Sequence, residues 1–315
     1  MYFPYLHGKR SELLALRDFA GFAGFDNTVC PVIEPVRHSF QELLTAIDIL
    51  TGNGFSPIVI MNPSKLDFRV GMGSWYKDIM GSNLAGRNWI PAMHVGNQHS
   101  VADVLSFANA FISRNVAVVY SSSNFSVHDL GLINNQENIV FQIVPPNSLN
   151  PQQRNVISAN KAVDIVNCFN AQRRNADYNG PEFFSNQIHY YRNNAVGYGD
   201  FTVLSTEVSD DGGPPGAVAI HATFKEATSL NILVEHFVST VTHQQQSNAT
   251  DKFLDAAGQL VTVVNSRPNE FGNNPALDSY RQQVSTSHFP GLGGNKRQQI
   301  LHHICLNRQV LLGQI

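Results

Sequence analysis

The residues that decide the fold are Trp89-Ile90-Pro91-Ala92-Met93-His94-Val95 and Val116-Ala117-Val118-Val119-Tyr120, with a helix-compatible segment at 100–113 between them. Neither apolar run alternates with polar residues, which is typical of strands buried on both faces. The intervening segment begins at Ser100, a good helix-capping residue, and continues with apolar residues at helical intervals. A strand, a helix and a second strand of this kind predict a right-handed βαβ unit.

The same unit recurs along the first half of the chain. Further apolar runs lie at 31–36, 57–62, 139–144 and 162–166, and further helix-compatible segments at 39–50, 126–132 and 150–159. This alternation, repeated about six times, predicts a parallel sheet, which a barrel or a doubly wound sheet would satisfy. Doubly wound nucleotide-binding folds carry a glycine-rich turn after the first strand, and residues 34–38 contain no glycine. The sequence therefore favours a barrel.

The end of the barrel is less regular. Runs at 201–205 and 217–224 would complete eight strands, with a helix over 181–192 before them. The turn-rich loop 206–216 separates these two runs, so they could form a hairpin, and 231–237 could add another strand. From about residue 247 the pattern is that of amphipathic helices. We expect a (β/α)8 TIM-barrel-like domain over 1–246, with an irregular closing sector, and a C-terminal helical extension over 247–315 packed on the barrel.

The composition is neutral and polar. Charged residues make up 14% of the chain, and about 50 Asn and Gln residues take their place. The net charge of -3 argues against electrostatic capture of nucleic acid, since the only groupings of basic residues are three pairs, although folding could gather these pairs into one patch. The three cysteines lie far apart, which fits a reducing compartment, and no signal peptide or long apolar segment is present. We expect a cytoplasmic protein with no membrane segment.

Several short motifs occur in a characteristic order. The chain opens with Tyr2-Phe3-Pro4-Tyr5-Leu6-His7-Gly8-Lys9 and continues with Pro31-Val32-Ile33-Glu34-Pro35-Val36. The later motifs are Gly197-Tyr198-Gly199-Asp200-Phe201, Gly212-Gly213-Pro214, Ala217-Val218-Ala219-Ile220-His221, His236-Phe237, His288-Phe289-Pro290-Gly291-Leu292-Gly293, Asn295-Lys296-Arg297 and His302-His303. Over essentially its whole length the chain resembles the beta protein family of phages and bacteria. The resemblance implies a prokaryotic or phage origin, in gene neighbourhoods concerned with mobile elements or conflict, and implies no particular reaction. One departure is that an arginine is expected where His7 stands.

Polar residues late in the predicted strands are the candidate site residues, because the active site of a (β/α)8 barrel lies at the C-terminal ends of its strands. The catalytic candidates are Glu34, His94, Asp200 and His221. The ligand-binding candidates are Arg37, Asn62, Lys65, Gln142, Asp164, Asn167 and, from the start of the last helix, Lys296.

Each candidate has a functional and a structural interpretation. Glu34 lies between Ile33 and Pro35, and a carboxylate in apolar surroundings can have a raised pKa suited to acid–base catalysis. It could equally form an ion pair inside the barrel with Arg37 or another basic group. Asp200 follows two glycines that would let a ligand approach the backbone, or it is a turn residue.

His94 and His221, with Glu34, Asp164 or Asp200, would suit a metal site, although such histidines are more often hydrogen-bonded core residues. Lys296 follows a glycine-rich turn, where the N-terminus of a helix could hold an anion, or the turn simply leads into the helix. The motif HExxH is absent, and the sequence identifies no cofactor.

Two classes of function follow. The first is a binding or assembly module of a prokaryotic or phage conflict (antiviral defence-type) system, with a polar ligand site at the C-terminal face of the barrel and a protein partner from the same gene neighbourhood. The alternative is a metal-dependent or acid–base hydrolase acting on a small-molecule or nucleotide-type substrate at that face. The amides Asn62, Gln142 and Asn167 among the candidates favour hydrogen-bonded recognition of a neutral polar ligand.

Overall fold

The computed structural model describes residues 1–24, 27–73, 75–122, 124–207, 216–229, 231–243 and 247–315. Contacts divide the chain into two compact units. The first unit comprises Met1–Leu13, Gly24–Asn167 and Gln187–Phe201, and the second comprises Leu14–Ala23, Cys168–Asn186 and Thr202–Ile315. Most of the turn-rich loop expected at 206–216, and the motif at 212–214, lie outside the described residues.

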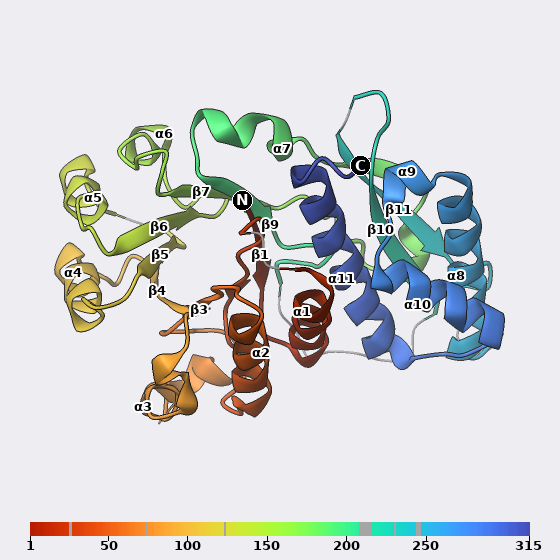
Figure 1. Cartoon of the computed structure of the whole chain (residues 1–315), viewed down its shortest axis with the longest axis horizontal. Helices are drawn as coiled ribbons and strands as arrows, with labels where there is room; N and C mark the ends of the chain where they lie inside the picture. Colours follow the sequence, from red (N-terminus) through yellow and green to blue (C-terminus); the bar gives the residue numbers. More distant parts are fainter. Residues whose placement is uncertain (25–26, 74, 123, 208–215, 230, 244–246) are drawn as a thin grey trace. The chain divides into compact units, whose positions relative to one another are not determined.

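The first unit is a closed parallel barrel, which confirms the predicted (β/α)8 fold (Figure 1). Its described strands neighbour one another in the order β1-β2-β3-β4-β5-β6-β7-β9, and β9 pairs with β1 to close the ring. The bounds are β1 Tyr2–Leu6, β2 Val32–Ile33, β3 Ile58–Ile60, β4 Ile90–Val95, β5 Val116–Tyr120, β6 Ile139–Val144, β7 Ala162–Val166 and β9 Gly197–Asp200.

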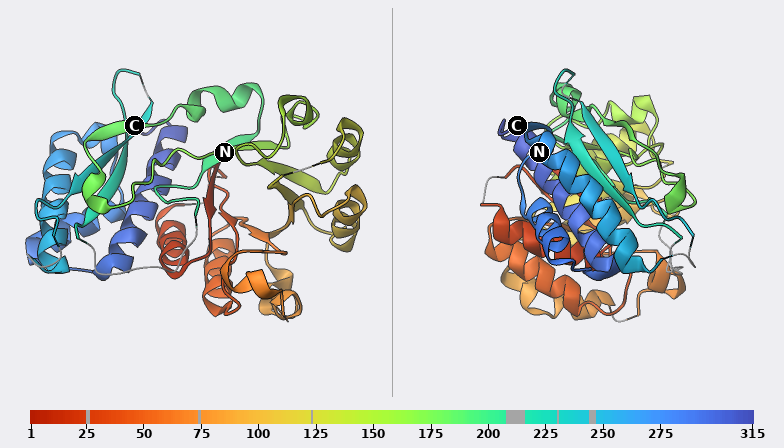
Figure 2. Two further views of the ribbon diagram at one scale, coloured as in Figure 1. Left: turned by 180° about the vertical axis from the view of Figure 1, so that it is seen from behind. Right: turned by 90° about the vertical axis from the view of Figure 1, so that its right-hand side faces the viewer.

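Helices follow most of these strands and lie around the outside of the barrel (Figure 1, Figure 2). They are α2 Gln41–Gly52, α3 Trp75–Met80, α4 Val101–Ala110, α5 Val127–Asn134, α6 Pro151–Arg154 and α7 Gln187–Tyr190, with 3-10 turns at Leu66–Val70, Asn83–Gly86 and Tyr191–Asn193. Ser100, Ser126 and Asn150 each form a capping box with the third residue of the following helix. These caps explain why the predicted helix starts at 100, 126 and 150 agree with the structure.

The barrel interior is filled by side chains on alternate strand positions. In β4, Ile90 and Ala92 belong to the inner cluster, whereas Met93 and Val95 pack with the helices outside. In β9 the inward positions are glycines, because Phe3 of β1 occupies the space. A Cβ atom at Gly199 would lie 1.9 Å from the backbone oxygen of Phe3. This alternation decides which of the predicted site residues can face the barrel interior.

The closing sector differs from the sequence prediction. The first strand is β1 at residues 2–6, so the run at 31–36 supplies the second strand. The strand predicted at 201–205 is wrong, because β9 ends at Asp200. The strand predicted at 217–224 is present, but it belongs to another sheet and not to the barrel. The helix predicted over 181–192 is wrong in its first half, which forms a strand through pairing with a distant segment.

The second unit contains an antiparallel sheet in the order β10-β11-β8 and a set of helices. Its strands are β8 Pro181–Ser185, β10 Ala219–Lys225 and β11 Ile232–Val238, so the strand expected at 231–237 is present and the hairpin is formed by β10 and β11. The helices are α8 Ala249–Ser266, α9 Pro268–Phe271, α10 Pro275–Thr286 and α11 Gly291–Leu311, and α1, Arg10–Phe22, lies mostly in this unit. Figure 2 shows α8, α10 and α11 running alongside one another. None of the helices in the described part of the chain has the length and hydropathy of a membrane crossing.

Candidate functional site

A buried carboxylate lies at the C-terminal end of the barrel strands. Glu34, directly after β2, has no exposed surface. Its Oε2 atom accepts hydrogen bonds from the Tyr5 hydroxyl and from Lys65 Nζ, each at 2.9 Å, and lies 3.9 Å from His7 Nε2. Its Oε1 atom is also buried and has no partner among the described residues. One oxygen is therefore fully engaged, and the other is an unused acceptor.

The backbone of the first strands brings these groups together. Tyr5 pairs in register with Val32, and the Glu34 N–H donates to the carbonyl of Leu6 at 2.8 Å, which extends the ladder beyond β2. Because inward positions alternate, Tyr5 and His7 on one segment and Glu34 on the next all face the interior. Lys65 reaches the same point from the loop after β3 and donates to His7 Nε2 at 2.9 Å.

Glu34 is ionised, contrary to the expectation of a raised pKa. Burial does raise the pKa of this carboxyl, but the Lys65 ammonium, His94 and His7 together hold it below its ordinary value. The physical reason is that a basic group inside the barrel contacts the carboxylate directly, as the structural interpretation allowed, and this group is Lys65 and not Arg37. Arg37 instead pairs with Asp67 at 2.9 Å on the surface. An ionised Glu34 can accept a hydrogen bond or a proton, and cannot act as a general acid at neutral pH.

The neighbouring imidazoles are neutral. Burial and the Lys65 charge lower the pKa of His7 to about 4, although Glu34 opposes the shift. Since Lys65 donates to its Nε2, the proton of neutral His7 resides on Nδ1. Burial also lowers the pKa of His94, although the negative charge of Glu34 acts to raise it. At neutral pH the cluster thus holds one negative charge, one positive charge and two neutral rings.

Asn62 has a supporting role in this cluster. Its side chain donates to the carbonyl of His94 at 2.8 Å and accepts from the His94 N–H at 2.7 Å. Both amide atoms are therefore used to fix the end of β4, and with it the position of the His94 ring.

The remaining barrel candidates face away from the interior. Gln142 accepts from the Tyr120 hydroxyl at 2.7 Å, and Asp200 accepts from the Tyr2 hydroxyl at 2.7 Å. Asp164 forms a two-pronged ion pair with Arg154, at 2.7 and 2.8 Å. All three occupy strand positions one residue away from inward-facing neighbours, namely Ile143, Gly199 and Val163. Asn167 is exposed just beyond β7.

The structure thus brings Glu34, His94 and Lys65 to one place in the first unit. His221, on β10, and Lys296, on α11, belong to the second unit. Tyr5 and His7, which the sequence reasoning did not select, lie on or next to β1, the strand that it did not identify. The motif at residues 2–9 was the available signal. Among the described residues, no group of three or more His, Cys, Asp or Glu side chains is arranged to hold a metal ion.

Comparison with known proteins adds no assignment. No protein-family model matches the chain, and no curated protein is significantly similar to it.

Proposed function

We propose that the first unit binds a small, neutral polar ligand at the C-terminal end of its barrel, with Glu34 as the principal recognition residue. The observation that carries the proposal is the unpartnered Oε1 of this ionised and fully buried carboxylate. A buried acceptor without a donor costs about 1–3 kcal/mol, and more when it is charged. A ligand N–H or O–H directed at Oε1 would recover that cost.

Lys65 adds a complementary group. Two of its three ammonium protons are used by Glu34 and His7, and its side chain remains 34% exposed, so it connects the buried cluster to the surface. Its remaining N–H can donate to the same ligand. The pair of groups suits a ligand that presents one donor and one acceptor, as amides, nucleobases and sugars do. The ligand is expected to be neutral because the charges of Glu34 and Lys65 already compensate each other.

The test compares two buried carboxylates that each accept from a tyrosine hydroxyl. Wild type, Glu34→Gln and the control Asp200→Asn are screened by thermal shift against nucleosides, monosaccharides and amino-acid amides. At least one class should stabilise wild type and Asp200→Asn, and bind Glu34→Gln about tenfold or more weakly, since a hydrogen bond to a charged group is lost. Equal binding by Glu34→Gln, or no stabilisation of wild type by any class, would contradict the proposal.

The acid–base hydrolase is the second candidate at the same place. It is favoured by the neutral imidazoles of His7 and His94, which interact electrostatically with Glu34 and can accept a proton from a bound nucleophile. Turnover of a ligand identified in the screen, abolished in Glu34→Gln and retained in Asp200→Asn, would establish it. The metal-dependent form of this function has no supporting cluster in the described part of the chain.

The biological setting is proposed from sequence alone. The resemblance to the beta protein family supports a cytoplasmic role in a prokaryotic or phage conflict system, with a protein partner encoded nearby. Co-purification of the tagged chain with products of neighbouring genes tests this role, and recovery of the chain without any of them would argue against it.

A further inference from the structure

The second unit contains a large cavity of about 1150 Å³. Its wall combines strand β10 with the segment around residues 169–178 and the first turns of α11. Ligand sites commonly measure about 300–1,000 Å³, so the cavity can hold an entire small molecule. Every described residue that lines it belongs to the second unit, and the cavity is therefore separate from the barrel site.

A chain of hydrogen bonds crosses the sheet and ends at this cavity. Oε1 of Glu182, on β8, lies 3.1 Å from His236 Nε2, and His236 Nδ1 lies 2.7 Å from His221 Nδ1. The register of the strands explains the arrangement, because His221 and His236 are directly opposite each other in the antiparallel pair. The Tyr178 ring packs on both imidazoles, at centroid distances of 4.4 and 4.8 Å, and holds them in one orientation.

These hydrogen bonds leave one imidazole nitrogen unused. A carboxylate only accepts, so the proton of neutral His236 is on Nε2, and its Nδ1 atom accepts the Nδ1 proton of His221. His221 Nε2 then carries a lone pair, and no described residue donates to it. Only 9% of His221 is exposed, and the residue lines the cavity. The cavity therefore presents a nearly buried acceptor that a ligand donor would satisfy.

The same hydrogen bonds provide a route for a proton. Burial lowers the pKa of His221 to about 3, so this ring does not keep an added proton by itself at neutral pH. When Nε2 takes up a proton, however, the Nδ1 proton of His221 can pass to His236. The positive charge then lies beside Glu182, whose carboxylate acts to raise the pKa of His236 against the effect of burial. The proton ends in an ion pair and not as an isolated buried charge.

The surface next to His221 suits an aromatic ring. Ala217, Ala219 and His221 occupy alternate positions along the chain, and all three line the cavity. The rings of Phe169 and Tyr178 also line it, with centroids 4.9 and 4.4 Å from that of the His221 imidazole. The unused nitrogen thus belongs to a polar group surrounded by apolar side chains. A planar ligand ring that carries a hydroxyl group has the matching features.

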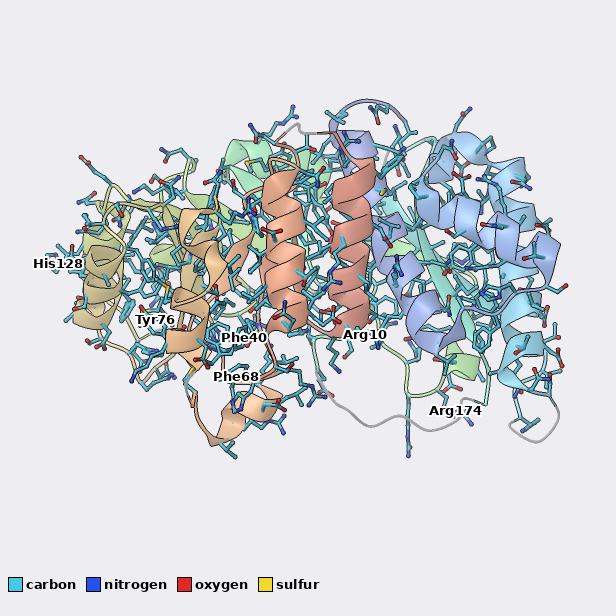
Figure 3. The ribbon with its side chains drawn as sticks, turned by 60° about the horizontal axis from the view of Figure 1, so that its bottom comes forward. Arg10, Phe40, Phe68, Tyr76, His128 and Arg174 are labelled. Carbon is cyan, nitrogen blue, oxygen red and sulfur yellow. The ribbon has the colours of Figure 1, made fainter. Side chains whose placement is uncertain are left out.

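The charged residues of the lining do not oppose an anion. Arg173 and Arg174 both line the cavity, and Asp177 is the one carboxylate among its described lining residues. Asp177 is paired with Arg174 at 2.6 Å, and the Arg174 side chain extends into solvent (Figure 3). A ligand that loses a proton in this cavity therefore does not meet an unpaired carboxylate.

We propose that this cavity binds an aromatic ligand with a phenol-type hydroxyl and ionises it, with His221 as the proton acceptor. The ligand O–H donates to His221 Nε2. On ionisation the O–H bond breaks, its proton forms a bond to Nε2, and the Nδ1 proton of His221 moves to His236 Nδ1. The products are a phenolate and a protonated His236 paired with Glu182, so every proton is accounted for. A phenol suits this transfer because its hydroxyl is acidic, as the tyrosine pKa of about 10 illustrates.

The first test uses the wild-type chain with 4-nitrophenol and its methyl ether, 4-nitroanisole, in a mildly acidic buffer in which most of the free phenol is protonated. Wild type should bind 4-nitrophenol about tenfold more tightly, because the ether has no proton to donate to His221. The bound phenol should also show the visible absorbance of its phenolate. Equal binding of the two compounds, or bound 4-nitrophenol without phenolate absorbance, would overturn the proposal.

The second test removes the charge at the far end of the hydrogen-bond chain. Glu182→Gln keeps an acceptor for His236, so 4-nitrophenol should still bind, but the ratio of bound phenolate to bound phenol should fall about tenfold because protonated His236 loses a charged partner. The control is Glu226→Gln, which removes a carboxylate that accepts from Ser229 outside the cavity lining, and it should behave as wild type. A phenolate signal in Glu182→Gln as large as in wild type would refute the transfer to His236.

Discussion

Gly199→Ala is expected to destabilise the first unit, because β1 and β9 approach each other too closely for a side chain at this position. A Cβ atom there would lie 1.9 Å from the backbone oxygen of Phe3 and 2.6 Å from Cδ1 of Ile165. The Ile165 methyl group can rotate away, but the Phe3 oxygen belongs to the neighbouring strand and can move only with it. A separation of 3.0 Å, the lower limit for such atoms, requires a backbone shift of about 1 Å.

The size of the effect follows from two opposing terms. Overpacking costs typically 1–3 kcal/mol, and a clash with backbone lies at the upper end of that range. Alanine also lowers the conformational entropy of the unfolded chain, which raises the free energy of unfolding by about 0.4–1 kcal/mol. The net loss in the free energy of unfolding is about 2–2.6 kcal/mol. Gly131→Ala is the matched control, because Gly131 lies within α5 with no atom within 4 Å of a new Cβ, and it should gain about 0.5–1 kcal/mol.

Urea denaturation followed by tryptophan fluorescence measures this difference. The chain has two tryptophans, Trp75 and Trp89, and both are buried in the first unit, so the signal reports on the barrel. The midpoint should fall for Gly199→Ala and rise slightly for Gly131→Ala. If Gly199→Ala were as stable as wild type while Gly131→Ala behaved as expected, β1 would not lie against β9, and the closure of the barrel would be refuted.

Two further predictions concern stability. Burial lowers the pKa of His302 from 6.5 to about 4. As the pH falls below about 6.5, the unfolded state therefore takes up a proton that the folded state does not bind. This histidine should lower the free energy of unfolding by about 2 kcal/mol at pH 5. Urea unfolding followed by circular dichroism at pH 7.5 and 5 checks this, and a His302→Asn variant with the wild-type pH dependence would contradict it. Arg154→Met leaves Asp164 unpaired in a partly exposed position and should cost about 1 kcal/mol, whereas Arg37→Met, from a more exposed pair with Asp67, should cost less than about 0.5 kcal/mol. If both variants lost the same free energy of unfolding in the fluorescence assay, the different burial of the two ion pairs would have no effect on their contribution to stability.

The barrel could be predicted from sequence where apolar runs are continuous, and not elsewhere. The strands from β2 to β7 coincide with Val- and Ile-rich runs. The sequence of β9, Gly-Tyr-Gly-Asp, has no such run, because two of its four residues are glycines that leave space for Phe3. That requirement arises from a contact between residues about 200 positions apart in the chain. Strand β8 is likewise defined by pairing with β11 and carries no local signal.

Much of the candidate site depended on which face of a strand each residue occupies. Glu34 and His94 were identified because they are polar residues at strand ends, and both face inward. Gln142 and Asp164 satisfied the same criterion and face outward, since a displacement of one residue reverses the face. In each strand two adjacent apolar residues point to opposite faces, and the sequence does not show which of the two points into the barrel. The direction depends on how the strands pair around the barrel, and a strand as short as β2, with two residues, shows no alternation of its own.

Several of the many Asn and Gln side chains bind the backbone. Asn62 binds both polar atoms of the His94 backbone, Asn138 donates to the carbonyl of Ala108 and Gln259 donates to that of Val238. These amides satisfy main-chain groups at strand and helix ends that would otherwise lack partners. The expectation that amides would form the recognition surface therefore applies poorly to Asn62 and Gln142. The ligand site that we propose in the barrel therefore depends on Glu34, whose buried Oε1 atom has no partner among the described residues.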